Sequence, residues 1–169
     1  MPYRNWSRYG VGAGVPLVIA IGSDHIGYEL KETIKKYVQE ELGLQVKDYG
    51  CHSLDPVDYP DVAVEVAEAV LREEQDCGIL ICGTGIGMSI AANKVPSIRA
   101  ALCHDVYSAE RARKSNNAQI LTMGARVIGE EHAKKIVEAF LKSEFSGGPS
   151  ATKVYKITRI EHSYVRPRT

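Results

Sequence analysis

The residue of this sequence whose neighbours most clearly suggest chemistry is a cysteine at the head of a glycine-rich loop. In the stretch ILICGTGIGMSIAANK, residues 79–94, an apolar run ends at Cys82 and glycines follow at alternate positions. Thiols beside backbone N–H donors at a helix start ionise more readily than free ones, and can then act as nucleophiles or bases. Proton abstraction needs only a base beside an anion-binding site, whereas nucleophilic catalysis also needs a partner base. The alternative interpretation of Cys82 is a small buried side chain at a strand end.

The glycine loop itself indicates anion binding and not dinucleotide binding. The fingerprint G-x-G-x-x-G fails because Met88 occupies the third glycine position after Gly83 and Gly85, and no P-loop pattern occurs. Backbone N–H groups from Gly83 to Met88 at a helix start would form a nest that holds a phosphate or the oxyanion of an enediolate. A purely structural turn between a strand and a helix is the alternative.

A second polar loop, GSDHIG at residues 22–27, follows the first predicted strand. In doubly wound sheets the first strand commonly lies beside the third, and ligands bind at that switch point, outside the carboxyl ends of the strands. This arrangement would bring Asp24 and His25 near Cys82 and Thr84. The convergence of the two loops is the strongest indication of a site that the residues alone provide.

The elements that must position these loops alternate along the chain. Apolar runs predict buried strands, and helical spacing of apolar residues predicts amphipathic helices between them. This alternation favours a doubly wound, Rossmann-like, three-layer α/β/α fold with a five-stranded parallel sheet. The predicted strands are residues 17–22, 44–50, 78–82, 98–103 and 118–125, and the predicted helices are 28–42, 61–74, 106–114, 130–142 and 150–164, with one more inside 87–94.

Length and composition limit the classes of function. At 169 residues, the chain is expected to form one domain over residues 17–165, after a flexible extension of residues 1–16. Because 21 basic residues balance 21 acidic ones, neither nucleic acid nor an anionic membrane is an expected partner. No CxxC pair and no signal peptide occur, so the four cysteines indicate a reducing compartment and a cytoplasmic location. The scattered His52, His132 and His162 do not suggest a metal site.

Several motifs together resemble one known family over nearly the whole chain from Leu17 onward. The chain is similar to the B-type ribose-5-phosphate isomerases, whose family also contains the galactose-6-phosphate isomerase subunits. The pairing of an Asp-His dipeptide with a Cys-Gly-Thr-Gly loop is the most specific part of the match. The motifs that carry the resemblance are GSDHIGYELK (22–31), DYPDVA (58–63), GILICGTGIGMSIAANK (78–94), RAALCHD (99–105) and GARVIG (124–129).

The resemblance implies aldose–ketose isomerisation of a sugar phosphate, a reaction of the pentose phosphate pathway in this family, without a metal or other cofactor. The Cys82 thiolate would move a proton between the two carbons next to the carbonyl through a cis-enediolate. Thr84 would move protons on the enediolate oxygens, and Asp24 would bind sugar hydroxyls. Some members have a glutamate base at the position of Met88, so here the base should be Cys82. The remaining pocket residues implied are His25 and Tyr59 as lining, Gly83, Gly85, Ile86 and Gly87 as loop donors, and Asn93 as a buttress of the loop.

The family builds each site from two subunits, so the resemblance also implies a homodimer with shared active sites. Its members have a His-Asn-Asp triplet at which this chain has Ser115, Asn116 and Asn117, so serine replaces the histidine that opens the sugar ring. Two phosphate-binding arginines of the family are replaced, one by Pro149 and the other by Lys153. Asn116 is retained for substrate binding, and the phosphate ligands expected here are Arg126 and Lys153.

These departures leave three interpretations open. Ribose 5-phosphate is the first expected substrate, with the ring opened by His104 or by water held between Ser115 and Asp24. A tetrose 4-phosphate is the second, because its esterified 4-hydroxyl prevents ring closure and removes the need for a ring-opening histidine; a hexose 6-phosphate would use the same chemistry. The third is a phospho-sugar-binding module without turnover, which the intact Cys82 and Thr84 disfavour.

Overall fold

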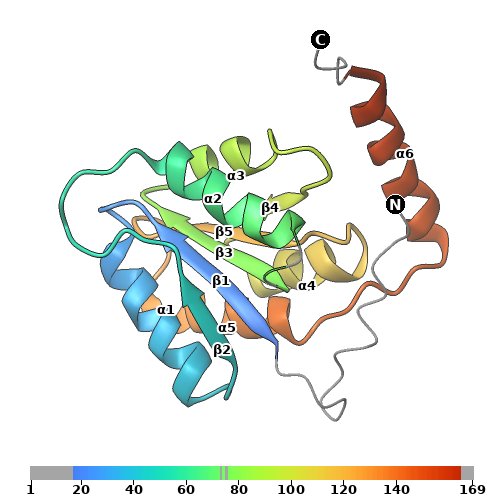
Figure 1. Ribbon diagram of the computed structural model, residues 1–169. Coiled ribbons are helices and arrows are strands. Elements are labelled where there is room, and N and C mark those ends of the chain that lie inside the picture. Colours follow the sequence, from blue (N-terminus) through green and yellow to red (C-terminus); the bar gives the residue numbers. More distant parts are fainter. Residues whose placement is uncertain (1–16, 73, 75, 165–169) are drawn as a thin grey trace.

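Five parallel strands form one sheet at the centre of the protein (Figure 1). The computed structural model describes residues 17–164 apart from 73 and 75, so the predicted extension of residues 1–16 lies outside the described residues. The strand order is β2-β1-β3-β5-β4, which confirms the predicted sheet and the adjacency of the first and third strands. The strands are β1 (Val18–Ser23), β2 (Gln45–Asp48), β3 (Cys77–Cys82), β4 (Ala100–Leu102) and β5 (Ile120–Gly124).

Helices cover both faces of this sheet and so make the three layers that the alternating pattern predicted (Figure 1). The helices α1, α4 and α5 pack on one face, and α2 and α3 pack on the other. α6 extends away from the sheet (Figure 1). The helices are α1 (Tyr28–Glu40), α2 (Tyr59–Leu71), α3 (Ile86–Ala92), α4 (Val106–Lys114), α5 (Glu130–Leu141) and α6 (Pro149–Tyr164).

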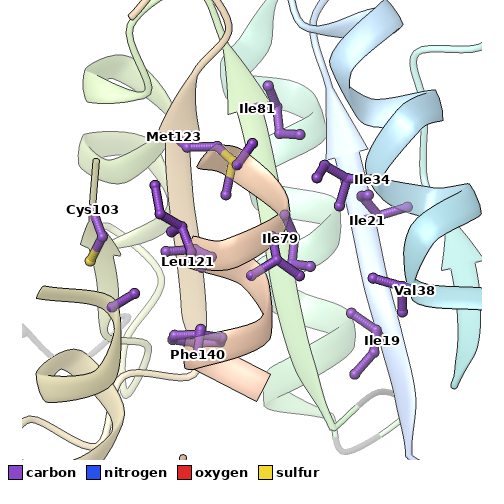
Figure 2. Packing of buried hydrophobic residues seen from close by; sticks show 14 of the residues in the cluster. Ile19, Ile21, Ile34, Val38, Ile79, Ile81, Cys103, Leu121, Met123 and Phe140 are labelled. Carbon is purple, nitrogen blue, oxygen red and sulfur yellow. The ribbon is translucent and has the colours of Figure 1, made fainter. Parts of the chain in front are cut away.

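The core consists of one apolar cluster on each face, because successive strand residues point to opposite sides of the sheet. Ile19 and Ile21 of β1 belong to the cluster under α1, α4 and α5, whereas Ala20 between them belongs to the cluster under α2 and α3. Figure 2 shows how side chains of the central strands fill the space beneath Ile34 of α1 and Phe140 of α5. The central strands are therefore buried on both faces, as their uninterrupted apolar sequences predicted.

Several element boundaries differ from those predicted. α2 begins at Tyr59 and not at residue 61, since Pro60 is tolerated in a first helical turn, where its missing N–H would have no partner. The fourth strand, predicted over 98–103, pairs only from Ala100 to Leu102. It lies at the edge of the sheet beside β5, so its length depends on a single neighbour. Local pattern does not contain that information.

Candidate active site

The two polar loops predicted to converge do lie side by side at the carboxyl edge of the sheet. β1 and β3 are neighbours with Ser23 opposite Ile81, so the residues that follow these strands emerge together. The Asp24 N–H donates to the Ile81 carbonyl at 3.2 Å, one residue before Cys82. A carboxylate and a thiol from segments almost sixty residues apart in the sequence thus share one edge of the sheet.

Asp24 is held in place by the start of α1. Its side chain is buried, and Oδ1 accepts a hydrogen bond from the Gly27 N–H at 2.8 Å. Gly27 itself lies directly against β3, because a Cβ there would come within 2.5 Å of the Ile81 carbonyl oxygen. A carboxylate offers about four acceptor positions, so one backbone donor leaves capacity for the hydroxyls of a ligand.

Cys82 is the last residue of β3, and its side chain is 5 % exposed. The Gly85 N–H donates to its Sγ at 3.1 Å, so the sulfur faces the loop as an acceptor. Gly85 can turn this way because it adopts φ +78°, a conformation that favours glycine. Burial raises the pKa of Cys77 and of Cys103 to about 11, which keeps both of these thiols protonated at neutral pH.

The residues after Cys82 present polar groups to solvent. Thr84 is exposed, and its Oγ1 accepts a hydrogen bond from the Ile86 N–H at 3.3 Å. The N–H groups of Gly87 and Met88 lie in the first turn of α3 and have no acceptor within their own helix. Backbone donors of this kind stabilise negative charge that develops on a ligand oxygen.

His25 and Tyr59 form a wall of the site from the side of α2. The Tyr59 ring lies against the glycine loop, since a Cβ on Gly87 would come within 2.6 Å of two ring carbons. The Val57 N–H donates to His25 Nδ1 at 3.4 Å, so the neutral ring carries its proton on Nε2. His25 is half-buried and Tyr59 is 40 % exposed, which leaves part of both side chains open to solvent.

Arg126 and Asn93 bracket the loop from two other directions. The Arg126 N–H donates to the Gly83 carbonyl at 3.0 Å, and its side-chain Cδ lies 3.9 Å from the Cβ position of Gly83. Asn93, at the end of α3, bonds through Nδ2 and Oδ1 to the Ala100 carbonyl (2.8 Å) and N–H (2.9 Å). This contact joins α3 to β4, whereas a direct role of either residue in substrate binding stays a prediction.

Gly124 supports the loop from below, and sequence reasoning missed it. It pairs with Cys82 across β3 and β5, and a Cβ there would lie 2.6 Å from the Thr84 carbonyl carbon. His104, predicted as a candidate for ring opening, accepts the Gly124 N–H on Nε2 at 3.0 Å. The GARVIG motif was a signal for this position, but nothing local indicated which backbone Gly124 would approach.

Ser115, Asn116 and Lys153 do not join Cys82 within one subunit. α4 runs against the strand direction, so Ser115 follows it at the edge where β5 begins, opposite to the edge that carries Cys82. The Ser115 hydroxyl hydrogen-bonds to the Arg111 guanidinium one turn earlier. Lys153 is exposed on α6. These three side chains could reach a Cys82 site only in another copy of the chain.

Two absences among the described residues and the arrangement of the two loops define the class of protein. Among the described residues, none of the helices has the length and apolar character to span a membrane. In the same part of the chain, no three His, Cys, Asp or Glu residues are grouped so that they could hold a metal ion. A doubly wound sheet that places a thiol, a carboxylate and a loop of N–H donors at its switch point defines a class of α/β protein able to move protons on an anionic ligand.

The family follows from comparison with known proteins. The family model described as Ribose/Galactose Isomerase matches residues 19–157. The chain belongs to this family of sugar-phosphate isomerases, which interconvert aldoses and ketoses, and the resemblance drawn from the motifs is confirmed.

Individual relatives support different substrates within that family. The chain is 57 % identical over 150 residues to a D-erythrulose-4-phosphate isomerase of Pectobacterium atrosepticum, covering 86 % of this chain and 96 % of the relative. It is 48 % identical over 143 residues to ribose-5-phosphate isomerase B of Escherichia coli, covering 85 % and 95 %. The structure of Clostridium thermocellum ribose-5-phosphate isomerase B superposes with a TM-score of 0.86 at 52 % identity, over 88 % of this chain and 100 % of the other.

Proposed function

We propose that this protein interconverts the ketose and aldose forms of a tetrose 4-phosphate, with Cys82 as the base that moves the proton. The main support for the chemistry is the buried Cys82 Sγ, which faces a loop of backbone N–H groups beside the Asp24 carboxylate. The carrying observation for the substrate is Ser115, in the place of the family's ring-opening histidine, together with the 57 % identity to an erythrulose-4-phosphate isomerase.

The proposed reaction moves one proton between two neighbouring carbons and one proton between their oxygens, so substrate and product are isomers. The Cys82 thiolate removes a proton from the carbon next to the carbonyl, and the electron pair moves onto the carbonyl oxygen to give a cis-enediolate. The resulting thiol returns a proton to the neighbouring carbon, and the carbonyl forms at the other oxygen. The exposed Thr84 hydroxyl moves the proton between these two oxygens.

Binding groups surround this chemistry on several sides. The N–H groups at the start of α3 hold the enediolate oxygens, and Asp24 orients the remaining hydroxyl groups. Arg126 attracts the phosphate from the side of the loop, where its side chain packs near Gly83. Lys153 adds a second positive charge if a partner subunit brings α6 to this edge.

The tetrose assignment rests on ring chemistry. Ribose 5-phosphate closes to a furanose through its free 4-hydroxyl, so an enzyme for it must first open the ring. A tetrose 4-phosphate has this hydroxyl esterified and stays open. Ser115, whose hydroxyl is bonded to Arg111, has no group that accepts or donates protons near neutral pH, which suits an open-chain substrate.

Ribose 5-phosphate is the second candidate, and from sequence alone it was the first. It is favoured by the 48 % identity to the Escherichia coli enzyme and by the superposition on the Clostridium thermocellum structure. The identity to the erythrulose-4-phosphate isomerase, combined with Ser115, changes the order of the two candidates.

A homodimer with shared sites is part of the proposal. β4 is an edge strand, and large apolar side chains around it are exposed, which is typical of a protein–protein interface. A second copy that covers this edge would bury these side chains and could supply Ser115, Asn116 and Lys153 to the site. The side chains concerned are Ile86 and Ile90 of α3, Leu102 of β4, and Val106 and Tyr107 of α4. The four free cysteines support the predicted cytoplasmic location.

Two experiments test the function and the assembly. Specificity constants for erythrulose 4-phosphate and ribose 5-phosphate are compared in the native protein and in Ser115→His. We expect the tetrose to be preferred and the histidine to raise turnover of ribose 5-phosphate; a native preference for ribose 5-phosphate that Ser115→His does not increase rejects the tetrose assignment.

Sedimentation should give a dimer that Ile90→Glu dissociates, with loss of activity.

A further inference from the structure

His104 replaces a strand carbonyl at the end of the sheet. β4 pairs with β5 up to Leu102, and the Cys103 N–H still donates to the Thr122 carbonyl at 3.1 Å. The next donor of β5 in this direction is the Gly124 N–H, which donates to His104 Nε2 at 3.0 Å. The imidazole therefore completes the ladder at the point where the backbone of the edge strand turns away.

This contact fixes the proton on the ring. A backbone N–H can only donate, so Nε2 must be unprotonated and the neutral imidazole carries its proton on Nδ1. Burial lowers the pKa of His104, and the titratable groups that act on it are Asp105, next in the chain, which opposes that shift, and His132 of α5, which adds to it. The ring thus stays neutral where an exposed histidine begins to take up a proton.

The same backbone segment carries the catalytic loop. Gly124 is the partner of Cys82 in the sheet, and the Cβ positions of Gly124 and Gly85 lie within 2.6–2.7 Å of the Thr84 and Met123 backbones respectively. Residues 123–124 therefore lie in direct contact with residues 84–85. A shift of the Gly124 N–H would displace Thr84 and the Gly85 N–H that donates to Cys82 Sγ.

We propose that His104 is a positioning residue that, as a neutral hydrogen-bond acceptor, holds the end of β5 beneath the Cys82–Gly85 loop, and that it does not open a sugar ring. Protonation would place a second N–H donor opposite the Gly124 N–H and would loosen this support as the pH falls. The inference extends the proposed function, because it concerns the loop that positions the proposed base.

Two substitutions of His104 distinguish a role as hydrogen-bond acceptor from a role in proton transfer. His104→Gln places an amide oxygen the same number of bonds from Cα as Nε2, so it keeps an acceptor but cannot transfer protons. His104→Leu removes the acceptor at similar volume. His162→Gln on α6, an exposed histidine, is the control. We expect kcat to fall about a hundredfold in His104→Leu, the cost of a displaced catalytic group, and to stay within about threefold of the native value in His104→Gln and in the control.

The pH profile and a chemical readout complete the test. The native enzyme should lose kcat only at pH values below the ordinary range of histidine titration, because burial lowers the pKa of His104, and His104→Gln should lack this acid limb. Equal loss of kcat in the Gln and Leu variants, or an unchanged acid limb in His104→Gln, would overturn the proposal. The rate at which iodoacetamide alkylates Cys82, followed by peptide mass spectrometry, should change in His104→Leu and not in His104→Gln. This readout needs no substrate, so it tests whether His104 positions the Cys82–Gly85 loop even if the proposed isomerase reaction is wrong.

Discussion

Gly124 lies with its backbone directly against that of Thr84, so close that a Cβ on Gly124 would come within 2.6 Å of the Thr84 carbonyl carbon and 2.7 Å of its Cα and carbonyl oxygen. The end of β5 and the Cys82–Gly85 loop are therefore packed as two backbones, without a side chain between them. Such contact fixes the loop more rigidly than side chains could, because backbone atoms have few ways to move aside.

Gly124→Ala tests this contact. The added methyl group must push the Thr84 backbone away, and we expect kcat to fall about a hundredfold, the usual effect of misplacing a catalytic group by about 1 Å. Gly129→Ala is the matched control, since a Cβ there meets nothing within 4 Å. Steady-state kinetics of both variants decide the matter, and equal activities would show that the loop tolerates the shift.

Cys82→Ser should preserve the fold and remove most of the activity. A serine hydroxyl is a far weaker acid than a thiol, so we expect kcat to fall by about 10²–10⁴, the contribution of a general base. Cys77→Ser is the control, because Cys77 lies at the other end of the same strand and is equally buried. Near-native kcat in a Cys82→Ser protein whose fold is verified by circular dichroism would contradict the role of Cys82 as the base.

Arg126→Ala should weaken binding of phosphorylated ligands selectively. A charge-assisted contact contributes about 1.5–3 kcal/mol, so KM for a sugar phosphate should rise about ten- to a hundredfold. Binding of the corresponding unphosphorylated sugar, measured by calorimetry, should change little. If both ligands lose the same affinity, Arg126 acts through the packing of its side chain near Gly83 and not through its charge.

A buried lysine joins α1 to β2 and to the segment that follows β2. Lys31 is fully buried, and its Nζ donates to the Asp48 carboxylate at 2.8 and 2.9 Å and to the Cys51 carbonyl at 2.7 Å. Lys31→Met should lower the free energy of unfolding by about 3 kcal/mol, at the lower end for a broken buried pair because Lys35 still pairs with Asp48. Urea unfolding of Lys36→Met, which removes an exposed ion pair 3.9 Å long, should show a change of less than about 1 kcal/mol.

The same network predicts how stability depends on pH. Burial alone would raise the pKa of Asp48, but hydrogen bonds from Lys31, Lys35 and the Gly50 N–H outweigh it and lower this pKa. A carboxylate whose pKa is lowered by folding stabilises the folded state at pH values above its pKa in the unfolded state. This contribution is lost as the pH falls through its pKa in the folded state. The stability difference between the native protein and Lys31→Met should therefore narrow below about pH 4. A difference that stays constant from pH 7 to pH 3 would exclude the charge of Asp48 as its cause.

The sequence by itself determined the alternation of strands and helices, the burial of the central strands and the meeting of Asp24 with Cys82. Apolar periodicity is local and shows in consecutive residues, and the switch point of a parallel sheet follows from a general rule of chain topology. Together these were enough to predict the fold and the adjacent positions of the two polar loops.

Only the tertiary structure decided that β5 lies between β3 and β4, that Gly124 supports Thr84 and that His104 accepts from Gly124. It also placed Ser115 and Asn116 at the sheet edge opposite Cys82 of the same chain, from which they could reach only the site of a second copy, the arrangement that the resemblance implies. The reason is physical: strand order, register and backbone contact are set by the packing of segments distant in the chain, and no local pattern of residues encodes them.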